Sequence, residues 1–233
     1  MNSRDGGRWM SDTDTDLLLV RHGEAHCNIA WVAGGDRGCT GLTPRGREQA
    51  ANLARALRPL HAARPIDVAY AAPRLRVRET AQTVCDELGL PVAAEPRLSG
   101  PDHGEADGRP WADIIAEFGG HPADRPEEPF APGSESWSEF LIRAGGCLRE
   151  LTELHRGQRV LVIAHGETVE AAHRLLMGVP AVTPLTYGFS VAHASLTWWS
   201  HRWSSAGRSR WSLVLHGATD GFHTIRPSRE NRS

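Results

Sequence analysis

The sequence predicts a three-layer α/β/α sandwich with a mostly parallel central sheet. Two short and almost wholly apolar runs, 17–20 and 160–164, have the pattern of strands that are buried on both faces. Stretches with apolar residues at helical spacing separate the strand-like runs, so strands alternate with helices along the chain. The length of 233 residues fits a single large domain, and no repeat or second core is evident.

The first half of the chain supplies the clearest start and stop signals. Thr43 is a good N-cap and Pro44 suits the first position of a helix, which continues with apolar residues at helical spacing. A second strand is expected over 66–70, and a helix over 74–88 that ends at Gly89.

The second half contains an unusual stretch and then returns to the alternating pattern. Residues 89–135 are rich in Pro, Gly, Asp and Glu, with one helical patch at 111–118, and are too long for a plain connection. Ser134 is expected to cap a long helix that the pair Gly145-Gly146 weakens. A further helix should follow the strand at 160–164 and run to Met177.

The Trp-rich segments 194–199 and 211–215 alternate like a hairpin at a sheet edge. We therefore expect one domain over 16–225, in which 89–135 forms a cap, between a disordered leader, 1–15, and a disordered tail, 226–233. Either Met1 or Met10 can be the start of the protein.

Composition excludes several function classes. The 26 basic residues are all arginine, so there is no lysine for a Schiff base, a P-loop or a kinase-type ATP site. The net charge of −2 argues against broad contact with nucleic acid. The four cysteines form no CxxC pair and no apolar run reaches the length of a membrane span, which predicts a cytoplasmic protein without membrane contact.

Two segments of the chain echo each other and carry the chemistry. LLLVRHGE at 17–24 and VLVIAHGE at 160–167 each run from a buried strand into His-Gly-Glu. Ligands of such sheets lie at the carboxyl ends of the strands, so His22 and His165 should share one crevice. Gly23 and Gly166 allow the backbone to approach a ligand closely. Arginines 74, 76 and 78 reach the same rim, and together these groups predict a pocket for a phosphoryl group.

Other interpretations of these residues are weaker. An isolated histidine at a strand end is usually structural, but the repeated context favours function for His22 and His165. Glu24 and Glu167 are explained as carboxylates at helix starts and are left out of the chemistry. The HExxH and zinc-deaminase patterns are incomplete. The tryptophans and arginines of 198–211 could stack on single-stranded nucleic acid, although packing in the core and at the edge fits better.

The motifs together resemble the histidine phosphatase superfamily, also called phosphoglycerate-mutase-like. The resemblance covers about 17–178, in order, and rests on Arg21-His22-Gly23-Glu24, Asn28, LTPRGREQA, Pro73-Arg74-Leu75-Arg76-Val77-Arg78-Glu79-Thr80-Ala81 and His165-Gly166.

The resemblance implies a specific division of labour. His22 is the nucleophile that becomes phosphohistidine, and Arg21, Arg76 and His165 hold the phosphoryl oxygens. The phosphate-binding arginine of the helix is Arg76, not its neighbours two residues away. Asn28 belongs to the substrate pocket. The resemblance implies neither a metal nor a cofactor.

One departure from the family pattern concerns the proton donor. The family's L-x-E-x-x-x-G-x-x-x-G stretch corresponds to 98–108, but Gly100 stands where the acid is expected. A glycine cannot protonate a leaving group. Glu105 is the preferred replacement and Asp102 the other candidate, unless protonation is simply weak.

The sequence thus predicts a metal-independent phosphatase that hydrolyses a small phosphomonoester through phosphohistidine. A phosphoglycerate mutase is the alternative within the same chemistry, but the mutase's long ERHYG-type stretch is replaced here by SGPDHGEADG. A catalytically weakened regulatory or binding module is the alternative from another class. The sequence leaves the substrate and the oligomeric state open.

Overall fold

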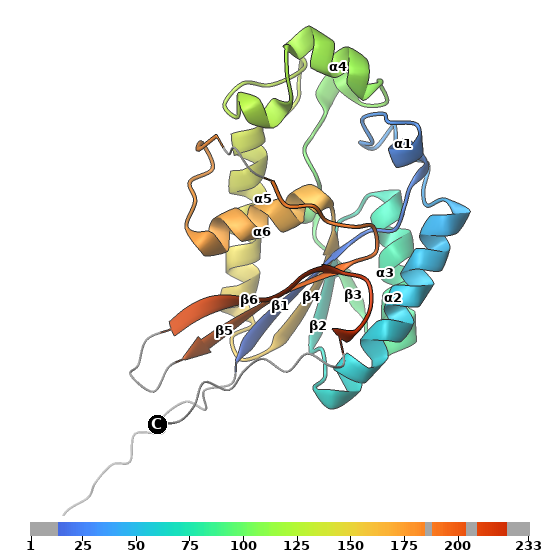
Figure 1. Ribbon diagram of the computed structural model, residues 1–233, viewed down its shortest axis with the longest axis vertical. Coiled ribbons are helices and arrows are strands. Elements are labelled where there is room, and N and C mark those ends of the chain that lie inside the picture. The colour runs from blue at the N-terminus through green and yellow to red at the C-terminus, as the bar shows by residue number, and fades with distance from the viewer. Residues whose placement is uncertain (1–13, 185–187, 204–208, 223–233) are drawn as a thin grey trace, which may run out of the picture.

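The protein folds around one six-stranded sheet, as the computed structural model of Figure 1 shows. The structure describes residues 14–184, 188–203 and 209–222. The expected tail, both candidate start residues and all but the last two residues of the expected leader lie outside these ranges. The strand order is β3-β2-β4-β1-β5-β6.

Four parallel strands form the larger part of the sheet. They are β1 (Thr15–Arg21), β2 (Val68–Ala71), β3 (Val92–Ala94) and β4 (Arg159–Ala164). The central pair, β1 and β4, is apolar and buried along nearly its whole length, as expected for strands covered on both faces.

Helices cover both faces of this sheet and make the predicted three layers. In Figure 1, α2 (Pro44–Ala63) and α3 (Leu75–Leu88) lie on one side, and α5 (Trp137–Leu154) and α6 (Gly166–Met177) lie on the other. The predicted cap of α2 is confirmed, since Thr43 Oγ1 accepts a hydrogen bond from the Gly46 N–H at 2.9 Å.

The start of α5 differs from the prediction. Ser136, not Ser134, is the N-cap, because Ser136 and Glu139 form a reciprocal capping box. The Ser134 hydroxyl instead accepts a hydrogen bond from the Ala131 N–H. The helix continues through Gly145 and Gly146, and the first of these glycines is buried close to Leu175 of α6.

Two strand boundaries were also missed. β1 begins at Thr15, the last residue of the expected leader and two residues before the expected strand. Thr15 and Asp16 already pair with His201 and Ser200 of the neighbouring antiparallel strand. β3 lies inside the stretch expected to be a cap, where three exposed residues gave no buried-strand pattern.

The rest of that stretch, called the cap below, lies above the sheet in Figure 1. It contains the short helical segments η1 (Pro96–Leu98), η2 (Gly104–Ala106) and η3 (Pro122–Asp124), and α4 (Trp111–Phe118). Ile114 and Phe130 of the cap share a small apolar cluster with Ala33, which follows the four-residue helix α1 (His26–Ile29).

The Trp-rich end forms the predicted hairpin at the sheet edge. β5 (Leu196–Trp203) pairs antiparallel with β1, and β6 (Ser209–Ala218) pairs antiparallel with β5. Trp198 and Trp199 are buried in the main core and Trp211 packs against it, in keeping with the packing expected for these residues, whereas the side chain of Trp203 lies outside what the structure describes.

All four cysteines are free and buried. Within the described ranges, no helix combines the length and the apolar character that a membrane crossing requires.

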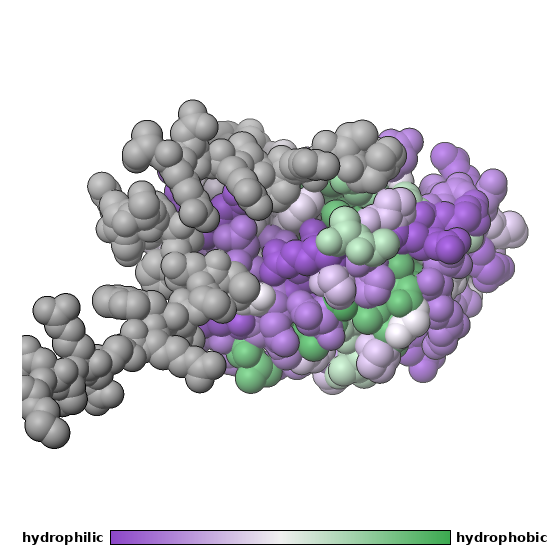
Figure 2. Space-filling model, turned by 90° about the horizontal axis from the view of Figure 1, so that it is seen from below, coloured by the Kyte–Doolittle hydropathy of each residue, from purple (hydrophilic) through white to green (hydrophobic). Residues whose placement is uncertain are grey.

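A buried ion pair joins the starts of β1 and β4. Asp16 Oδ2 accepts from Arg159 Nε at 3.0 Å and from Arg64 Nη1 at 2.9 Å, and Arg159 also donates to the Leu60 carbonyl. This end of the sheet lies away from the cap. Figure 2 views the molecule from that side, and the residues drawn in colour there are largely hydrophilic.

Breaking this pair should cost stability. Arg159→Ala leaves the buried Asp16 carboxylate with Arg64 as its one cation and the carbonyls of Leu60 and Arg64 without this donor, and it lowers the free energy of unfolding by about 3–5 kcal/mol, measured by urea denaturation. Arg58→Ala is the control, because Arg58 pairs with Glu87 at the surface and should change stability by less than about 1 kcal/mol. Equal effects of the two substitutions would contradict the prediction.

Candidate active site

The two echoed histidines meet at the carboxyl ends of the central strands. β1 and β4 are in register, with Arg21 opposite Ala164, so the next residue of each strand is a histidine. The His22 N–H donates to the Ala164 carbonyl at 3.0 Å. The ring centroids of His22 and His165 are 5.4 Å apart and their planes are nearly perpendicular. The structure therefore brings the pair together as the sequence predicts.

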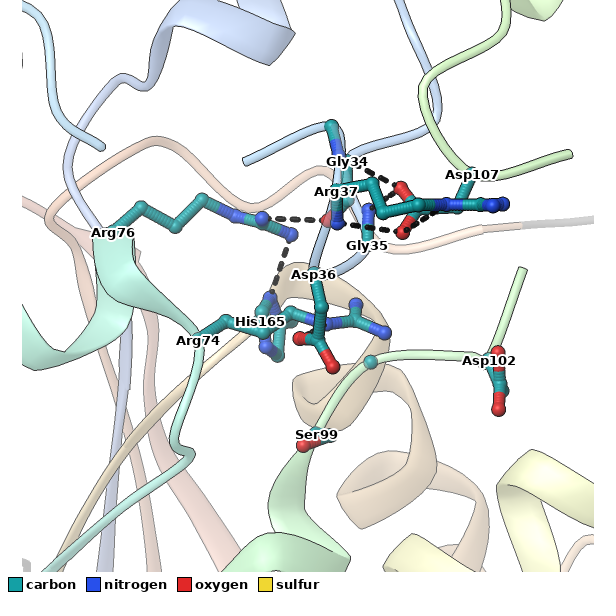
Figure 3. A network of polar contacts seen from close by, with 12 residues as sticks. Gly34, Gly35, Asp36, Arg37, Arg74, Arg76, Ser99, Asp102, Asp107 and His165 are labelled. Atoms are coloured by element: carbon teal, nitrogen blue, oxygen red, sulfur yellow. Dashed lines mark hydrogen bonds and ion pairs between the residues drawn. The ribbon is translucent and has the colours of Figure 1, made fainter. Parts of the chain in front are cut away.

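Arg76 connects the two rings. From the first turn of α3, its Nε donates to His22 Nε2 at 3.0 Å and its Nη2 lies 3.2 Å from His165 Nδ1. Its Nη1 donates to the Gly34 carbonyl at 2.7 Å, and Figure 3 shows the guanidinium between Gly34 and His165. A buried cation thus lies between the two imidazoles and the loop that follows α1.

The contacts of His22 fix its tautomer. His22 Nδ1 lies 2.7 Å from the carbonyl of Gly23, which can only accept, so Nδ1 carries the proton. Nε2 then has the free electron pair. Burial, followed by the charge of Arg76, lowers the pKa of His22 well below its usual value. The ring is therefore neutral at pH 7 and has the form that a nucleophile needs.

His165 has the complementary tautomer. The Arg76 guanidinium can only donate, so His165 Nδ1 accepts and Nε2 carries the proton. Burial and then the charge of Arg76 lower the pKa of His165 well below its usual value. His165 Nε2 is buried and makes no hydrogen bond with the described residues. A neutral N–H donor is thus available beside the nucleophile.

Arg21 completes the cationic side of the site. Its Nη1 donates to the Val191 carbonyl and its Nη2 lies 2.8 Å from His193 Nε2, which together hold the side chain at the end of β1. Its Nε is buried and makes no hydrogen bond with the described residues. Arg21 can therefore offer its Nε N–H to an anion.

The backbone around His22 is held by α3. The Gly23 N–H donates to Thr80 Oγ1 at 3.1 Å, and that hydroxyl donates to the Arg76 carbonyl at 2.8 Å. A Cβ on Gly23 would lie 2.4 Å from the carbonyl oxygen of Gly46, so only glycine fits there. The glycine after His22 thus serves close packing of the backbone, and its N–H is occupied by Thr80.

Two other predicted binding residues lie in different settings. Asn28 Oδ1 accepts from the Ala25 N–H at 3.0 Å and caps α1, and among the described residues no hydrogen bond joins Asn28 to His22 or His165. Gly166 opens α6 and lines a cavity together with Arg21. The start of this twelve-residue helix favours a bound anion.

The arginines around Arg76 are not equivalent. Arg78 is exposed, whereas Arg74 is buried and donates to the Pro101 carbonyl at 2.7 Å. A Cβ on Gly100 would lie 3.0 Å from Arg74 Nη1 and 3.3 Å from the His165 ring. The position where the family pattern has an acid therefore faces the site, and Arg74 is a second cation there whose burial the sequence did not reveal.

The predicted replacement acids lie at the rim. Glu105 and Asp102 are both exposed, and Asp102 Oδ1 accepts from the Gly104 N–H. No contact between either carboxylate and the histidines is found among the described residues. The structure does not bring Glu105 to the cluster that contains the other four predicted catalytic residues.

Asp107 is a positioning residue that the sequence analysis missed. Its carboxylate accepts from the backbone N–H groups of Gly35, Arg37 and Gly38 at 2.8–3.0 Å, as Figure 3 shows for the first two. Burial acts in the opposite direction, but these three hydrogen bonds lower the pKa of Asp107. A single aspartate in a glycine-rich loop gives no signal of its own, and here it ties the cap to the loop that Arg76 contacts.

Comparisons with known proteins show what the chain is similar to. The chain is 30% identical over 187 residues to phosphoserine phosphatase 1 of Hydrogenobacter thermophilus. The aligned region covers 76% of this chain and 85% of the relative. It is 32% identical over 171 residues to a 2,3-bisphosphoglycerate-dependent phosphoglycerate mutase of Methylobacterium radiotolerans, covering 70% and 79% of the two chains.

A solved structure shares the fold. The mycobacterial glucosyl-3-phosphoglycerate phosphatase superposes with a TM-score of 0.72 at 23% identity, covering 87% of this chain and 99% of the other. The family model of the histidine phosphatase superfamily, branch 1, matches residues 17–218. The chain belongs to the histidine phosphatase superfamily.

Proposed function

We propose that this protein is a metal-independent phosphatase that hydrolyses a small phosphomonoester through a phosphohistidine on His22. The observation that carries the proposal is the buried triad of His22, Arg76 and His165, in which both imidazoles are neutral and the arginine joins them. Relatives named as phosphatases support the same chemistry.

The first half of the reaction forms the phosphoenzyme. His22 Nε2 attacks phosphorus, the N–P bond forms, and the bond between phosphorus and the ester oxygen breaks. Arg76 leaves Nε2 as the ester enters and donates its N–H groups to the phosphoryl oxygens. Arg21 Nε and His165 Nε2 donate to the same oxygens, and these prepositioned donors stabilise the charge of the transition state.

The second half regenerates the enzyme. Water attacks phosphorus, the N–P bond breaks, and inorganic phosphate leaves as His22 recovers its electron pair. The hydrogen bond from His22 Nδ1 to the Gly23 carbonyl keeps the ring oriented through both halves.

The alcohol that departs in the first half also needs a proton, for which Glu105 remains the prediction from sequence. Its exposed carboxylate has to move toward the bound ester to deliver that proton.

A mutase is the second candidate, because phosphoglycerate mutases occur among the relatives. Release of inorganic phosphate from phenyl phosphate in the presence of EDTA distinguishes the two activities. A phosphatase releases phosphate, whereas a mutase returns the phosphoryl group to phosphoglycerate and releases little. A binding module releases none. We expect the protein to release phosphate.

We place the enzyme in the cytoplasm, in keeping with its four free cysteines.

His22→Ala should abolish turnover. The substitution removes the nucleophile, so activity on phenyl phosphate should fall at least about a hundredfold. No acid-labile, base-stable phosphoenzyme should be trapped from the variant by rapid quench, whereas the unmodified enzyme should give one. Activity above a hundredth of the starting value would rule out the covalent step.

Arg76 and Arg78, two residues apart on α3, should differ in importance for catalysis. Arg76→Ala removes a donor to the phosphoryl group, and kcat/KM should fall by about 10²–10³-fold. Arg78→Ala is the matched control on the exposed face of the same helix and should change kcat/KM less than about twofold. The reverse order would show that the phosphate site lies elsewhere on α3.

Glu105→Gln tests the proton donor. If Glu105 protonates the leaving oxygen, alkyl phosphates should lose about 10²–10⁴-fold in kcat. Nitrophenyl phosphate should lose much less, because its leaving group hardly needs a proton. Asp102→Asn tests the other candidate from the same loop, and a loss confined to alkyl phosphates in that variant would assign the proton to Asp102. Small and equal effects on both esters would remove Glu105 from the catalytic residues, and Gly100→Glu should then raise turnover of the alkyl ester.

A further inference from the structure

A cavity of about 240 Å³ adjoins the phosphoryl site between the cap and α6. Arg21 and Gly166 line it, and these residues directly neighbour His22 and His165 in the chain. The remaining lining residues come from the cap, from the start of α5, from α6 and from the segment at 189–191. The position of this cavity suits the leaving group of an ester bound at His22, and its small size suits a single ring rather than a polymer.

Aromatic side chains form one wall of the cavity. Trp111 and Phe130 lie with ring centroids 6.1 Å apart at a shallow angle of 35°. The ring of His103 stands edge-on to Trp111 at 5.5 Å. All three residues line the cavity, and such a wall favours the flat apolar face of a ring.

Polar atoms without partners lie on the same walls. Trp137 Nε1 and His103 Nδ1 are buried, their residues are only 5% and 6% exposed, and neither atom has a hydrogen-bond partner among the described residues. Buried polar atoms nearly always have a hydrogen-bond partner, either in the protein or on a bound molecule, so these two atoms can bind a ligand of the cavity. Burial and then the charge of Arg74 lower the pKa of His103 to about 4, so the ring is neutral. Trp137 can only donate, so the ligand must offer an oxygen acceptor.

Two carboxylates face the same space. Glu167 and Glu170 line the cavity, and Glu170 pairs with Arg174 at 3.1 Å. Burial opposes ionisation of Glu167, but a backbone N–H and the charge of Arg21 lower its pKa, so it is ionised. Apart from Arg21, no arginine is among the lining residues. Glu170 is compensated by Arg174, whereas the Glu167 carboxylate has no ion-pair partner among the described residues. Glu167 therefore disfavours a leaving group with a second anion beside it and accepts hydrogen bonds from hydroxyl groups.

We propose that this cavity selects an uncharged, hydroxyl-bearing ring as the leaving group, such as the ring of a sugar phosphate. One face of the ring lies against Trp111 and Phe130. A ring oxygen accepts from Trp137 Nε1, and ring hydroxyls donate to Glu167. The proposal rests on the proposed phosphatase function for its orientation, because the phosphoryl group has to lie at His22.

Binding can be measured without turnover in the His22→Ala protein. Isothermal titration with glucose 6-phosphate and with cyclohexylmethyl phosphate compares two rings of similar shape, with and without hydroxyl groups. We expect the sugar ester to bind more tightly. Adding Trp137→Phe should weaken binding of glucose 6-phosphate about tenfold and leave cyclohexylmethyl phosphate within about twofold. Trp198→Phe is the matched control, because Trp198 Nε1 is also buried and unpartnered but lies in β5 outside the cavity.

A second variant tests the charge of the cavity and does not alter its aromatic packing. Glycerol 3-phosphate and 3-phosphoglycerate differ in one hydroxymethyl group that is replaced by a carboxylate. The protein with Glu167 intact should bind the uncharged member of the pair more tightly. Glu167→Gln should reduce that preference at least about threefold, whereas Glu153→Gln on the exposed face of α5 should not change it.

The outcomes separate this proposal from the proposed function. Phosphate release from phenyl phosphate by the unmodified enzyme tests the phosphatase function alone. If phosphate is released but the two rings bind equally, or if 3-phosphoglycerate binds more tightly than glycerol 3-phosphate, the cavity proposal is wrong. If the binding preferences hold and no phosphate is released, the cavity proposal stands and the phosphatase function is wrong.

Discussion

The structure of the site depends on one buried guanidinium. Arg76 donates to His22 Nε2, to the Gly34 carbonyl and toward His165 Nδ1, so a single side chain from α3 joins both echoed strands and the loop after α1. A buried cation without an acidic partner is costly unless its N–H groups are satisfied. Here two neutral rings and a carbonyl satisfy them, and an incoming phosphoryl group supplies the missing negative charge.

The same arrangement explains why both histidines are neutral. Burial and the nearby positive charge disfavour protonation of either ring, and the two tautomers are then set by what each neighbour can donate or accept. His22 presents an electron pair and His165 presents an N–H. One ring can therefore attack while the other holds an oxygen, although both follow buried strands with nearly identical sequences.

Polar contacts attach the cap to this centre. Asp107 holds the loop at 35–38 through three backbone N–H groups, and Arg74 holds the cap at Pro101. Both residues reach the same rim as Arg76. In the proposed function, phosphoryl transfer and selection of the leaving group thus belong to different elements that share one boundary.

The sequence by itself determined the sandwich, the pairing of the two strand ends and the four residues that meet there. Those features depend on local patterns: buried apolar runs, helix caps and motifs of adjacent residues at strand ends. Only the tertiary structure decided that Asn28 caps a helix, that Arg74 is buried beside Gly100 and that Glu105 is exposed. It also decided which aromatic rings and unpartnered donors of the cap face the cavity. Those properties depend on contacts between segments far apart in the chain, where side-chain direction and burial leave no periodic signal in the sequence.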